Sequence, residues 1–227
     1  MTMIDLVIVE PDEAPARDMV LSQLLAQWGI DSFQNDQLKR DGYGKPYLDL
    51  PEPRKIGYSS SHARWADGSF GLFALAENCA IGIDVEPWPK KAADAAFLET
   101  IAVPEDAASL AHLGGDGYDA STALWVIKET ALKCTGEVMI DPRHLAVRRE
   151  RKGTFLVSSS KMAGAPHPDI RVTLYLLQNI DLRIGLFLVG IGLSANCDAG
   201  KGNMIVIQKL SQSWKWNSFE PIWPVIH

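Results

Sequence analysis

The chain has 227 residues and a mass of 24.9 kDa, with 47% hydrophobic and 22% charged residues. This size allows one large domain or two small ones, and it buries enough surface to fold without a metal or disulfide staple. The net charge of −6 argues against binding of nucleic acid through the overall field. Residues 1–113 carry 9 basic and 18 acidic residues, and residues 114–227 carry 13 and 10. The second half can therefore face an acidic partner.

The cysteines, the N-terminal stretch and the apolar runs together favour a cytoplasmic location. Cys79, Cys134 and Cys197 form no C-x-x-C pair, and an odd number without metal-ligand spacing predicts reduced thiols. The acidic stretch 1–13 lacks the order of a signal peptide. The longest apolar run, 184–193, is about half the length that spans a bilayer. We therefore expect a soluble, cytoplasmic protein.

The first half is predicted to contain a strand, a helix and a group of strands. The apolar run 6–9 predicts a strand, and apolar residues at three- and four-residue intervals over 16–28 predict a helix that ends at Gly29. One short extended piece is expected at 47–48, within a loop rich in glycine and proline. Further strands are predicted at 56–61, 70–75 and 80–85. Helices at 92–101 and 104–113 precede a glycine-rich linker at 114–117.

The second half opens with the clearest helix of the sequence, 120–135, whose apolar residues share one face and which Gly136 closes. Strand-like segments follow at 145–149, 154–157, 171–177 and 183–193. Residues 201–227 are interpreted as a loosely attached tail that packs on the body through its tryptophans. Each half thus consists of helix plus strands, which allows a duplicated α+β unit with halves at 1–113 and 114–200.

Two carboxylates, Asp84 and Glu86, lie two residues apart in a predicted strand, so both point to one face of the sheet. They repel each other unless a cation or a proton separates them, which is costly in an apolar segment. A hard cation such as Mg²⁺ binds such ligands, keeps several waters and favours a substrate phosphate. The alternative is a strand end whose two acids face water, as acidic residues ordinarily do.

Other polar residues carry weaker signals when each is taken alone. Glu129 and Lys133 form an i, i+4 pair that is ordinary on an exposed helix, and Lys128 beside them would then be a plain surface charge. His62 follows a run of three serines, which can bind phosphate oxygens or can be local turn chemistry. Lys45, between a glycine and a proline, can reach an anion from a stiff loop.

The order of these motifs is more specific than any one of them. Along the chain they are Gly44-Lys45-Pro46, Ser61-His62, Gly82-Ile83-Asp84-Val85-Glu86 and Trp125-x-x-Lys128-Glu129-x-x-x-Lys133. Over about residues 17–136 this arrangement resembles the 4′-phosphopantetheinyl transferase superfamily, in its long, surfactin-synthetase-activating type. The resemblance implies a pseudo-twofold duplication of two similar α+β halves. Each half is a helix packed on a mainly antiparallel sheet, and the active site lies in the cleft between the halves.

The resemblance also implies an activity. Such a transferase moves the 4′-phosphopantetheine arm of coenzyme A onto a serine of an acyl or peptidyl carrier protein and releases adenosine 3′,5′-bisphosphate, as a holo-[acyl-carrier-protein] synthase does. The implied metal is Mg²⁺, with Mn²⁺ possible, and its implied ligands are Asp84, Glu86 and Glu129. The residues implied to bind coenzyme A are Arg17, Lys45, Ser61, His62, Lys128 and Lys133.

Phosphoryl transfer needs mainly positioning and neutralisation of charge, which Lys133 and His62 can supply beside the metal. The carrier serine loses a proton as it attacks, and the base is either Glu129 or a metal-bound water held by Glu86. The carrier helix in such systems is acidic and can dock on a basic cluster. That cluster is equally interpreted as a solvated hairpin, and its members are Arg143, Arg148, Arg149, Arg151 and Lys152. We expect a monomer, because two halves in one chain already build the cleft.

The sequence departs from the family pattern at two motif positions. Ala63 and Val126 stand where the family usually has serine or threonine, after His62 and after Trp125. The family's basic residues ahead of the first helix are also missing. A second hypothesis is therefore a catalytically weak homologue that binds the carrier protein or coenzyme A without modifying it. A metal-dependent phosphoester hydrolase is a third.

Overall fold

The structure is a computed structural model of the chain. It describes residues 3–9, 17–31, 33–42, 44–50, 56–65, 68–88, 95–114, 119–137, 140–151, 153–161, 163, 166–179, 186–194, 204–209 and 216–221. Within these ranges, no helix has both the length and the apolar character needed to cross a membrane. The cytoplasmic location stays a prediction.

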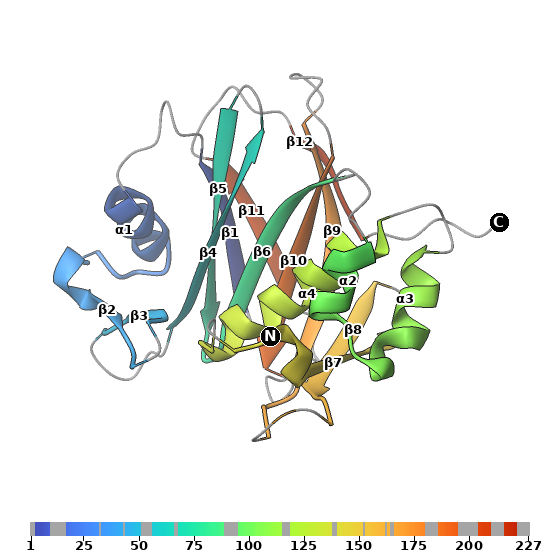
Figure 1. The fold of residues 1–227 in the computed structure, drawn as a ribbon. Helices are drawn as coiled ribbons and strands as arrows, with labels where there is room; N and C mark the ends of the chain where they lie inside the picture. The colour runs from blue at the N-terminus through green and yellow to red at the C-terminus, as the bar shows by residue number, and fades with distance from the viewer. Residues whose placement is uncertain are drawn as a thin grey trace.

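The elements follow the order that the sequence predicts, and most strands are longer than predicted (Figure 1). The helices are α1 (Arg17–Gln27), α2 (Ala95–Ile101), α3 (Ala107–Gly114) and α4 (Ala120–Thr135), with 3-10 helices η1 (Asn35–Gln37), η2 (Pro104–Asp106) and η3 (Pro142–His144). The strands of the first half are β1 (Met3–Val9), β2 (Leu38–Arg40), β3 (Pro46–Leu48), β4 (Ile56–Trp65), β5 (Gly68–Glu77) and β6 (Ile81–Trp88). The later strands are β7 (Leu145–Arg151), β8 (Thr154–Ser159), β9 (Ile170–Asn179), β10 (Leu186–Ser194), β11 (Met204–Lys209) and β12 (Trp216–Pro221).

One sheet has the strand order β11-β1-β5-β4, with β1 and β11 parallel and the other neighbours antiparallel. Helix α1 covers one face of this sheet (Figure 1). Its apolar side chains Leu21, Leu24 and Leu25 pack against Tyr58 of β4 and Leu75 of β5. The apolar residues at three- and four-residue intervals thus form the buried face of the predicted helix, and their burial stabilises it.

A second, antiparallel sheet has the order β6-β10-β9-β8-β7, and β12 pairs with the end of β9 that β8 does not reach. Helix α4 covers one face of it through residues such as Val126 and Ile127. The opposite face of β6 and β10 packs on the first sheet, where Ile83 and Val189 share a core with Leu72. The layers are therefore helix, sheet, sheet, helix. The predicted α+β class is confirmed, and an internal duplication stays a prediction.

Helix α4 has the bounds that the sequence predicts, because both of its ends are encoded locally. The Asp119 side chain caps the start and accepts a hydrogen bond from the Ser121 backbone N–H at 3.1 Å. Gly136 closes the end with a positive φ of 89°, and its N–H donates to the Leu132 carbonyl.

Glycines let α4 lie very close to the second sheet. A Cβ placed on Gly82 of β6 would lie 2.1 Å from the Thr130 carbonyl oxygen and 2.6 Å from the Cys134 backbone nitrogen. A Cβ on Gly190 of β10 would lie 2.4 Å from Thr130 Oγ1. Because glycine carries no side chain, the helix backbone lies against the strand at Gly82, and the Thr130 side chain lies against it at Gly190. This approach sets the distance between α4 and the end of β6 that carries Asp84.

The strand pairing differs from the predicted division of the chain. Strand β6 lies within the predicted N-terminal half but pairs with β10 of the second sheet, so the sheets do not divide at residue 113. The predicted tail supplies β11 beside β1 and β12 beside β9. A tail built into both sheets is not loosely attached, and the prediction was wrong on this point. Pairing partners depend on contacts between distant segments, which a local pattern does not contain.

The cysteines also differ from expectation. Cys79 is disulfide-bonded, so the prediction of reduced thiols was wrong for this residue. Cys134 is free and buried in the last turn of α4, and burial raises the pKa of its thiol to about 12. Such a thiol stays protonated at neutral pH and is a poor nucleophile.

Candidate active site

The end of α4 and strand β6 bring a lysine and two carboxylates together. Along β6, Asp84 lies on the same face as Gly82, which is the face that α4 covers. Lys133 Nζ lies 2.7 Å from Asp84 Oδ1 and 3.8 Å from Glu129 Oε1. Glu129 and Lys133 are thus not an exposed surface pair. Both are about four-fifths buried, with 21% of each side chain exposed, and both face Asp84.

Asp84 has one satisfied and one unsatisfied oxygen. Its Oδ1 accepts hydrogen bonds from Ser61 Oγ at 3.0 Å and from Lys133 Nζ at 2.7 Å. Its Oδ2 is buried and has no hydrogen-bond partner among the described residues. A buried carboxylate oxygen without a partner is costly, and a bound cation is a usual reason for it. The interpretation of Asp84 as a solvated strand end is excluded, because only 5% of its side chain is exposed.

The carboxylates near Lys133 act on one another. Burial raises the pKa of Glu129, the Lys133 ammonium opposes this shift, and the negative charges of Asp84 and Glu86 raise the pKa further. Several carboxylate oxygens close together are the kind of ligands that a hard divalent cation binds. In the described part of the chain, no three acidic, histidine or cysteine side chains form a metal site as they stand. The Lys133 ammonium lies between Asp84 and Glu129 instead. The donor set fits Mg²⁺, and its role as a ligand set stays a proposal.

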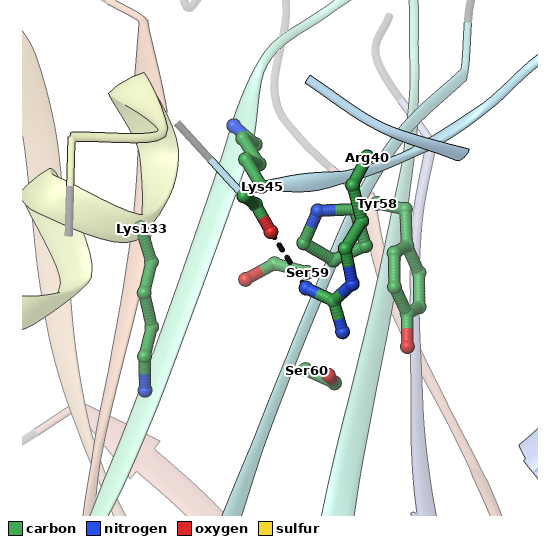
Figure 2. Close-up of a pocket in the computed structure, with 8 residues that line it drawn as sticks. Arg40, Lys45, Tyr58, Ser59, Ser60 and Lys133 are labelled. Atoms are coloured by element: carbon green, nitrogen blue, oxygen red, sulfur yellow. Dashed lines mark hydrogen bonds between the residues drawn. The ribbon is translucent and has the colours of Figure 1, made fainter. Parts of the chain in front are cut away.

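A pocket of about 200 Å³ begins at Lys133 and reaches the β2–β3 hairpin (Figure 2). It is lined by Arg40, Gly44, Lys45, Pro46, Tyr58, Ser59, Ser60 and Lys133. Figure 2 shows Arg40 and Lys133 extending in the same direction on either side of Ser59. Three of the lining residues are basic and none is acidic, although the chain has a net charge of −6. The pocket is therefore suited to an anionic ligand.

The hairpin turn holds Arg40 at the pocket. Gly44 adopts a positive φ of 86°, and its N–H donates to the Asp41 carbonyl at 3.0 Å. The Asp41 side chain accepts from the Lys45 N–H at 3.0 Å, and Arg40 Nη1 donates to the Gly44 carbonyl at 2.6 Å. Sequence reasoning missed Arg40. The signal in the sequence was the turn-forming stretch 41–44. A hairpin turn there places Arg40 opposite Pro46 of the Gly44-Lys45-Pro46 motif.

Lys45 connects this hairpin to the end of α4. Its Nζ donates to the carbonyl of Cys134 in the last turn of the helix, and burial lowers the pKa of its ammonium. A cation at a helix C-terminus interacts favourably with the unpaired carbonyls and the helix dipole. Lys45 therefore lines the pocket and also fixes the hairpin against the helix that carries Glu129 and Lys133.

Residues 80–176 match the family model of the 4′-phosphopantetheinyl transferase superfamily. The matched segment includes β6 and α4, and with them the three acids and Lys133. It covers 97 of the 227 residues, and no curated protein matches the chain. The match supports the superfamily that the motif order predicts.

The other residues that the superfamily resemblance singled out lie at different positions relative to the site. Ser61 joins Asp84 and Lys133, with Lys133 Nζ 3.2 Å from Ser61 Oγ. His62 follows in β4 and therefore points to the other face of the strand, the face that carries Tyr58 and Ser60. His62 does not line the pocket. Arg17 is the first residue of α1, and its side chain lies outside the described residues.

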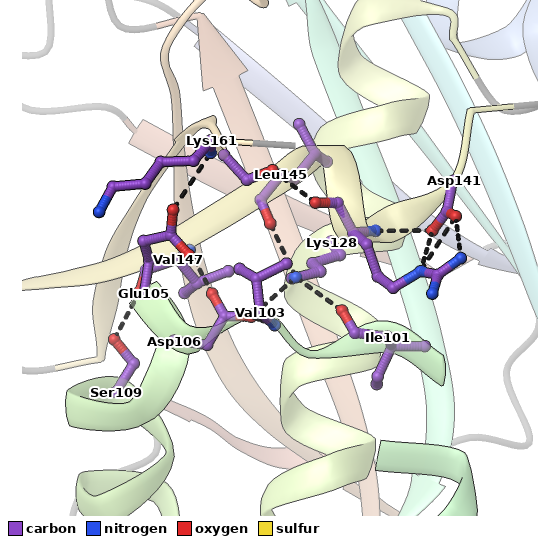
Figure 3. Close-up of polar contacts among 12 residues, drawn as sticks. Ile101, Val103, Glu105, Asp106, Ser109, Lys128, Asp141, Leu145, Val147 and Lys161 are labelled. Atoms are coloured by element: carbon purple, nitrogen blue, oxygen red, sulfur yellow. Dashed lines mark hydrogen bonds and ion pairs between the residues drawn. The ribbon is translucent and has the colours of Figure 1, made fainter. Parts of the chain in front are cut away.

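Lys128 does not lie in the pocket, and its predicted contact with coenzyme A is corrected. Its side chain is 0% exposed, and its Nζ lies 2.8 Å from Asp106 Oδ2 (Figure 3). It donates to the Ile101 carbonyl at 2.7 Å and to the Leu145 carbonyl at 2.8 Å. The interpretation of Lys128 as a surface charge is wrong for the same reason. Next to Glu129 on a helix, it necessarily points about 100° away from the site.

The two departures from the superfamily pattern lie in the core. Ala63 is 3% exposed and packs between the two sheets, in the cluster that contains Leu72 and Ile83. Val126 is 0% exposed, and its Cγ1 lies against Gly190 of β10. Neither side chain lines the pocket. These substitutions exchange a small polar residue for an apolar one inside the protein, where an apolar side chain needs no hydrogen-bond partner.

The predicted docking cluster is only partly available for an acidic partner. Arg143 binds Asp141 through Nε and Nη2, with Nη2 2.6 Å from Oδ2, and this arginine lowers the pKa of Asp141 to about 2. Glu150 lies between the cluster's arginines and pairs with Arg171 at 2.6 Å. Arg148 and Arg151 are exposed, Arg149 is half-buried and Lys152 lies outside the described residues.

Proposed function

We propose that this protein is a Mg²⁺-dependent 4′-phosphopantetheinyl transferase of the long, surfactin-synthetase-activating type. It acts on acyl or peptidyl carrier proteins and uses coenzyme A as the donor. The observation that carries this proposal is the position of Lys133, which belongs both to the carboxylate cluster and to the basic pocket. A ligand with phosphates in that pocket has a phosphate at Lys133 and therefore next to Asp84 and Glu129.

The residues divide into two groups by role. Asp84, Glu86 and Glu129 would hold Mg²⁺, which neutralises charge on the pyrophosphate when it is bound. Lys133 binds the reacting phosphate, and Arg40 and Lys45 hold the rest of the donor through its other phosphates. Together these cations orient the donor so that the phosphorus that carries the arm faces the carrier protein.

The chemical step forms one bond and breaks one. The carrier serine Oγ attacks that phosphorus, and the bond from the phosphorus to the oxygen of adenosine 3′,5′-bisphosphate breaks. The serine proton goes to a base, and the leaving group departs with the electron pair of the broken bond. Glu129 and a water held by Glu86 both remain candidates for the base. The low exposure of Glu129 and Lys133 limits water near the reacting phosphate and strengthens the electrostatic interactions that a bound phosphate makes there.

The second hypothesis, binding without transfer, loses most of its support. It rested on Ala63 and Val126, which lie in the core and not at the site. It rested also on the missing basic residues before the first helix, and Arg40 supplies a cation to the pocket that the motif pattern did not include. A phosphoester hydrolase remains distinguishable by one product, free phosphopantetheine formed without a carrier.

The deciding experiment is the intact mass of an apo carrier protein after incubation with this protein, coenzyme A and Mg²⁺. Transfer adds about 340 Da, the mass of the arm in this phosphoryl-transfer scheme. A reaction without enzyme is the control for spontaneous modification. No added mass on several carriers, together with coenzyme A bound to the protein, would contradict transfer and favour the binding-only homologue.

Arg40→Ala is expected to raise the KM for coenzyme A about tenfold or more with little change in kcat. A charge-assisted hydrogen bond contributes about 1.5–3 kcal/mol, and a contact made equally in the ground and transition states changes KM alone. Steady-state kinetics at varied coenzyme A measures it. Lys39→Ala is the matched control, because Lys39 is the exposed neighbour on β2 and does not line the pocket. An equal effect of both variants contradicts a specific role of Arg40.

A further inference from the structure

An ion pair between Lys128 of α4 and Asp106 of η2 lies in the protein interior (Figure 3). Lys128 points about 100° away from Glu129 around the helix, so the pair lies on another side of α4 than the site. Both side chains are 0% exposed, and their charged atoms are 2.8 Å apart. Lys128 lies directly before Glu129 in the chain, so the pair and the candidate site share one helical turn.

Every strong hydrogen-bonding group of this pair has a partner. The ammonium of Lys128 has three hydrogens, and they match three acceptors: the Ile101 carbonyl, the Leu145 carbonyl and Asp106 Oδ2. The Asp106 carboxylate also accepts the Val103 N–H at 2.9 Å and the Val147 N–H at 2.7 Å. The contacts therefore join three parts of the fold at one point, namely α4, the segment from α2 to η2, and β7.

Stability alone is a weak reason for this arrangement. Desolvation of two charges commonly costs as much as their attraction returns, and a well-packed apolar pair is often as stable. What a buried pair with directed hydrogen bonds provides is a fixed geometry. The apolar face of α4 packs on aliphatic side chains such as Val172 and Leu174 of β9, and the glycines of β6 and β10 set its distance from the sheet. The three acceptors around Lys128 add directed polar contacts on another side of the helix.

The rotation of α4 decides whether the site forms. Residues next to each other on a helix point about 100° apart, and residues four apart lie on one face. With Lys128 fixed toward Asp106, Glu129 and Lys133 face β6, where Lys133 meets Asp84 at 2.7 Å. A rotation of α4 by a fraction of a turn would remove that contact.

We propose that the Lys128–Asp106 pair is a positioning device, which fixes the rotation of α4 so that Glu129 and Lys133 reach Asp84. Lys128 is then a positioning residue that touches no substrate. The inference rests on the proposed function only for the identity of the ligand at the carboxylates. The geometry that it concerns exists without any ligand.

The test uses the full-length chain with Lys128→Met and with the double variant Lys128→Met/Asp106→Asn, which removes both charges. Two readouts are taken besides activity. The first is Mn²⁺ affinity, from calorimetry or from the electron paramagnetic resonance of the free ion. The second is the carboxyl carbon shift of Asp84 in NMR without metal, which reports the contact with Lys133. Circular dichroism and the melting temperature establish that each variant is folded.

We expect Mn²⁺ affinity to fall about 10- to 100-fold in both variants, as it does when groups that orient metal ligands are removed. The Asp84 signal moves toward that of Lys133→Met, which lacks the contact. The matched control is Ser109→Ala, because Ser109 is buried in the same region and donates its hydrogen bond to the Val147 carbonyl at 2.8 Å, not to Lys128 or Asp106. It is expected to lower the melting temperature and to leave both readouts unchanged.

Several results would overturn the inference. One is a folded double variant with wild-type Mn²⁺ affinity and an unchanged Asp84 signal, and another is an equal loss in Ser109→Ala. If the double variant does not fold, Asp106→Asn alone keeps the shape of the side chain and is judged by the same readouts. If the wild-type protein binds no Mn²⁺, the proposed metal site fails, and the metal-free Asp84 signal still decides the positioning role.

Discussion

Asp84→Asn reduces carrier modification at least about a hundredfold at saturating coenzyme A, because it removes a carboxylate that would hold Mg²⁺, whose positive charge stabilises the transition state. Asparagine keeps the size of the side chain and the hydrogen bond from Ser61, but it removes the negative charge that Lys133 Nζ contacts at 2.7 Å. It also replaces Oδ2, which has no hydrogen-bond partner within the described part of the chain, with an amide nitrogen. The measurement is the initial rate of mass gain of the apo carrier protein at fixed Mg²⁺.

The control for this variant is Asp169→Asn, the same chemical change at an exposed acid. It is expected to keep the wild-type rate. Glu129→Gln is expected to show a loss of the same order as Asp84→Asn, since both carboxylates flank Lys133. Undiminished turnover in Asp84→Asn and Glu129→Gln would remove the assignment of a metal to these residues.

Gly82→Ala destabilises the protein through the contact between β6 and α4. A Cβ there would lie 2.1 Å from the Thr130 carbonyl oxygen and 2.6 Å from the Cys134 backbone nitrogen, and neither backbone atom is able to rotate away. The helix must shift, which costs about 1–3 kcal/mol or more. For a chain of this size each kcal/mol lowers the melting temperature by about 2–4 °C. Thermal and urea unfolding both measure the loss.

Gly42→Ala is the matched control, because no atom lies within 4 Å of a Cβ at this position. It is expected to change the stability by less than about 0.5 kcal/mol, as surface substitutions usually do. Equal stability of Gly82→Ala and the wild-type protein would show that α4 packs less closely on β6 than described. Because the shift moves Glu129 and Lys133, Gly82→Ala is also expected to lower the transfer rate in protein that remains folded.

Some features of this protein were determined by local sequence. The bounds of α4 follow from its cap at each end and its apolar face, and Gly136 has the left-handed conformation expected of a C-terminal cap. Asp84 and Glu86 share a face of β6 because side chains alternate along any strand. The spacing of Glu129 and Lys133 places both on one side of the helix. Each of these depends on neighbours within about four residues.

The tertiary structure decided which of these groups meet. Asp84 and Lys133 are 49 residues apart in the chain and lie 2.7 Å apart in space because Gly82 admits α4 to the sheet. Arg40 belongs to the pocket because the β2–β3 hairpin packs beside Ser59 of β4 and Lys133 of α4. Lys128 is a buried structural lysine because Asp106, 22 residues earlier, pairs with its ammonium. No local pattern contains these pairings, since their energies depend on segments that only folding brings together.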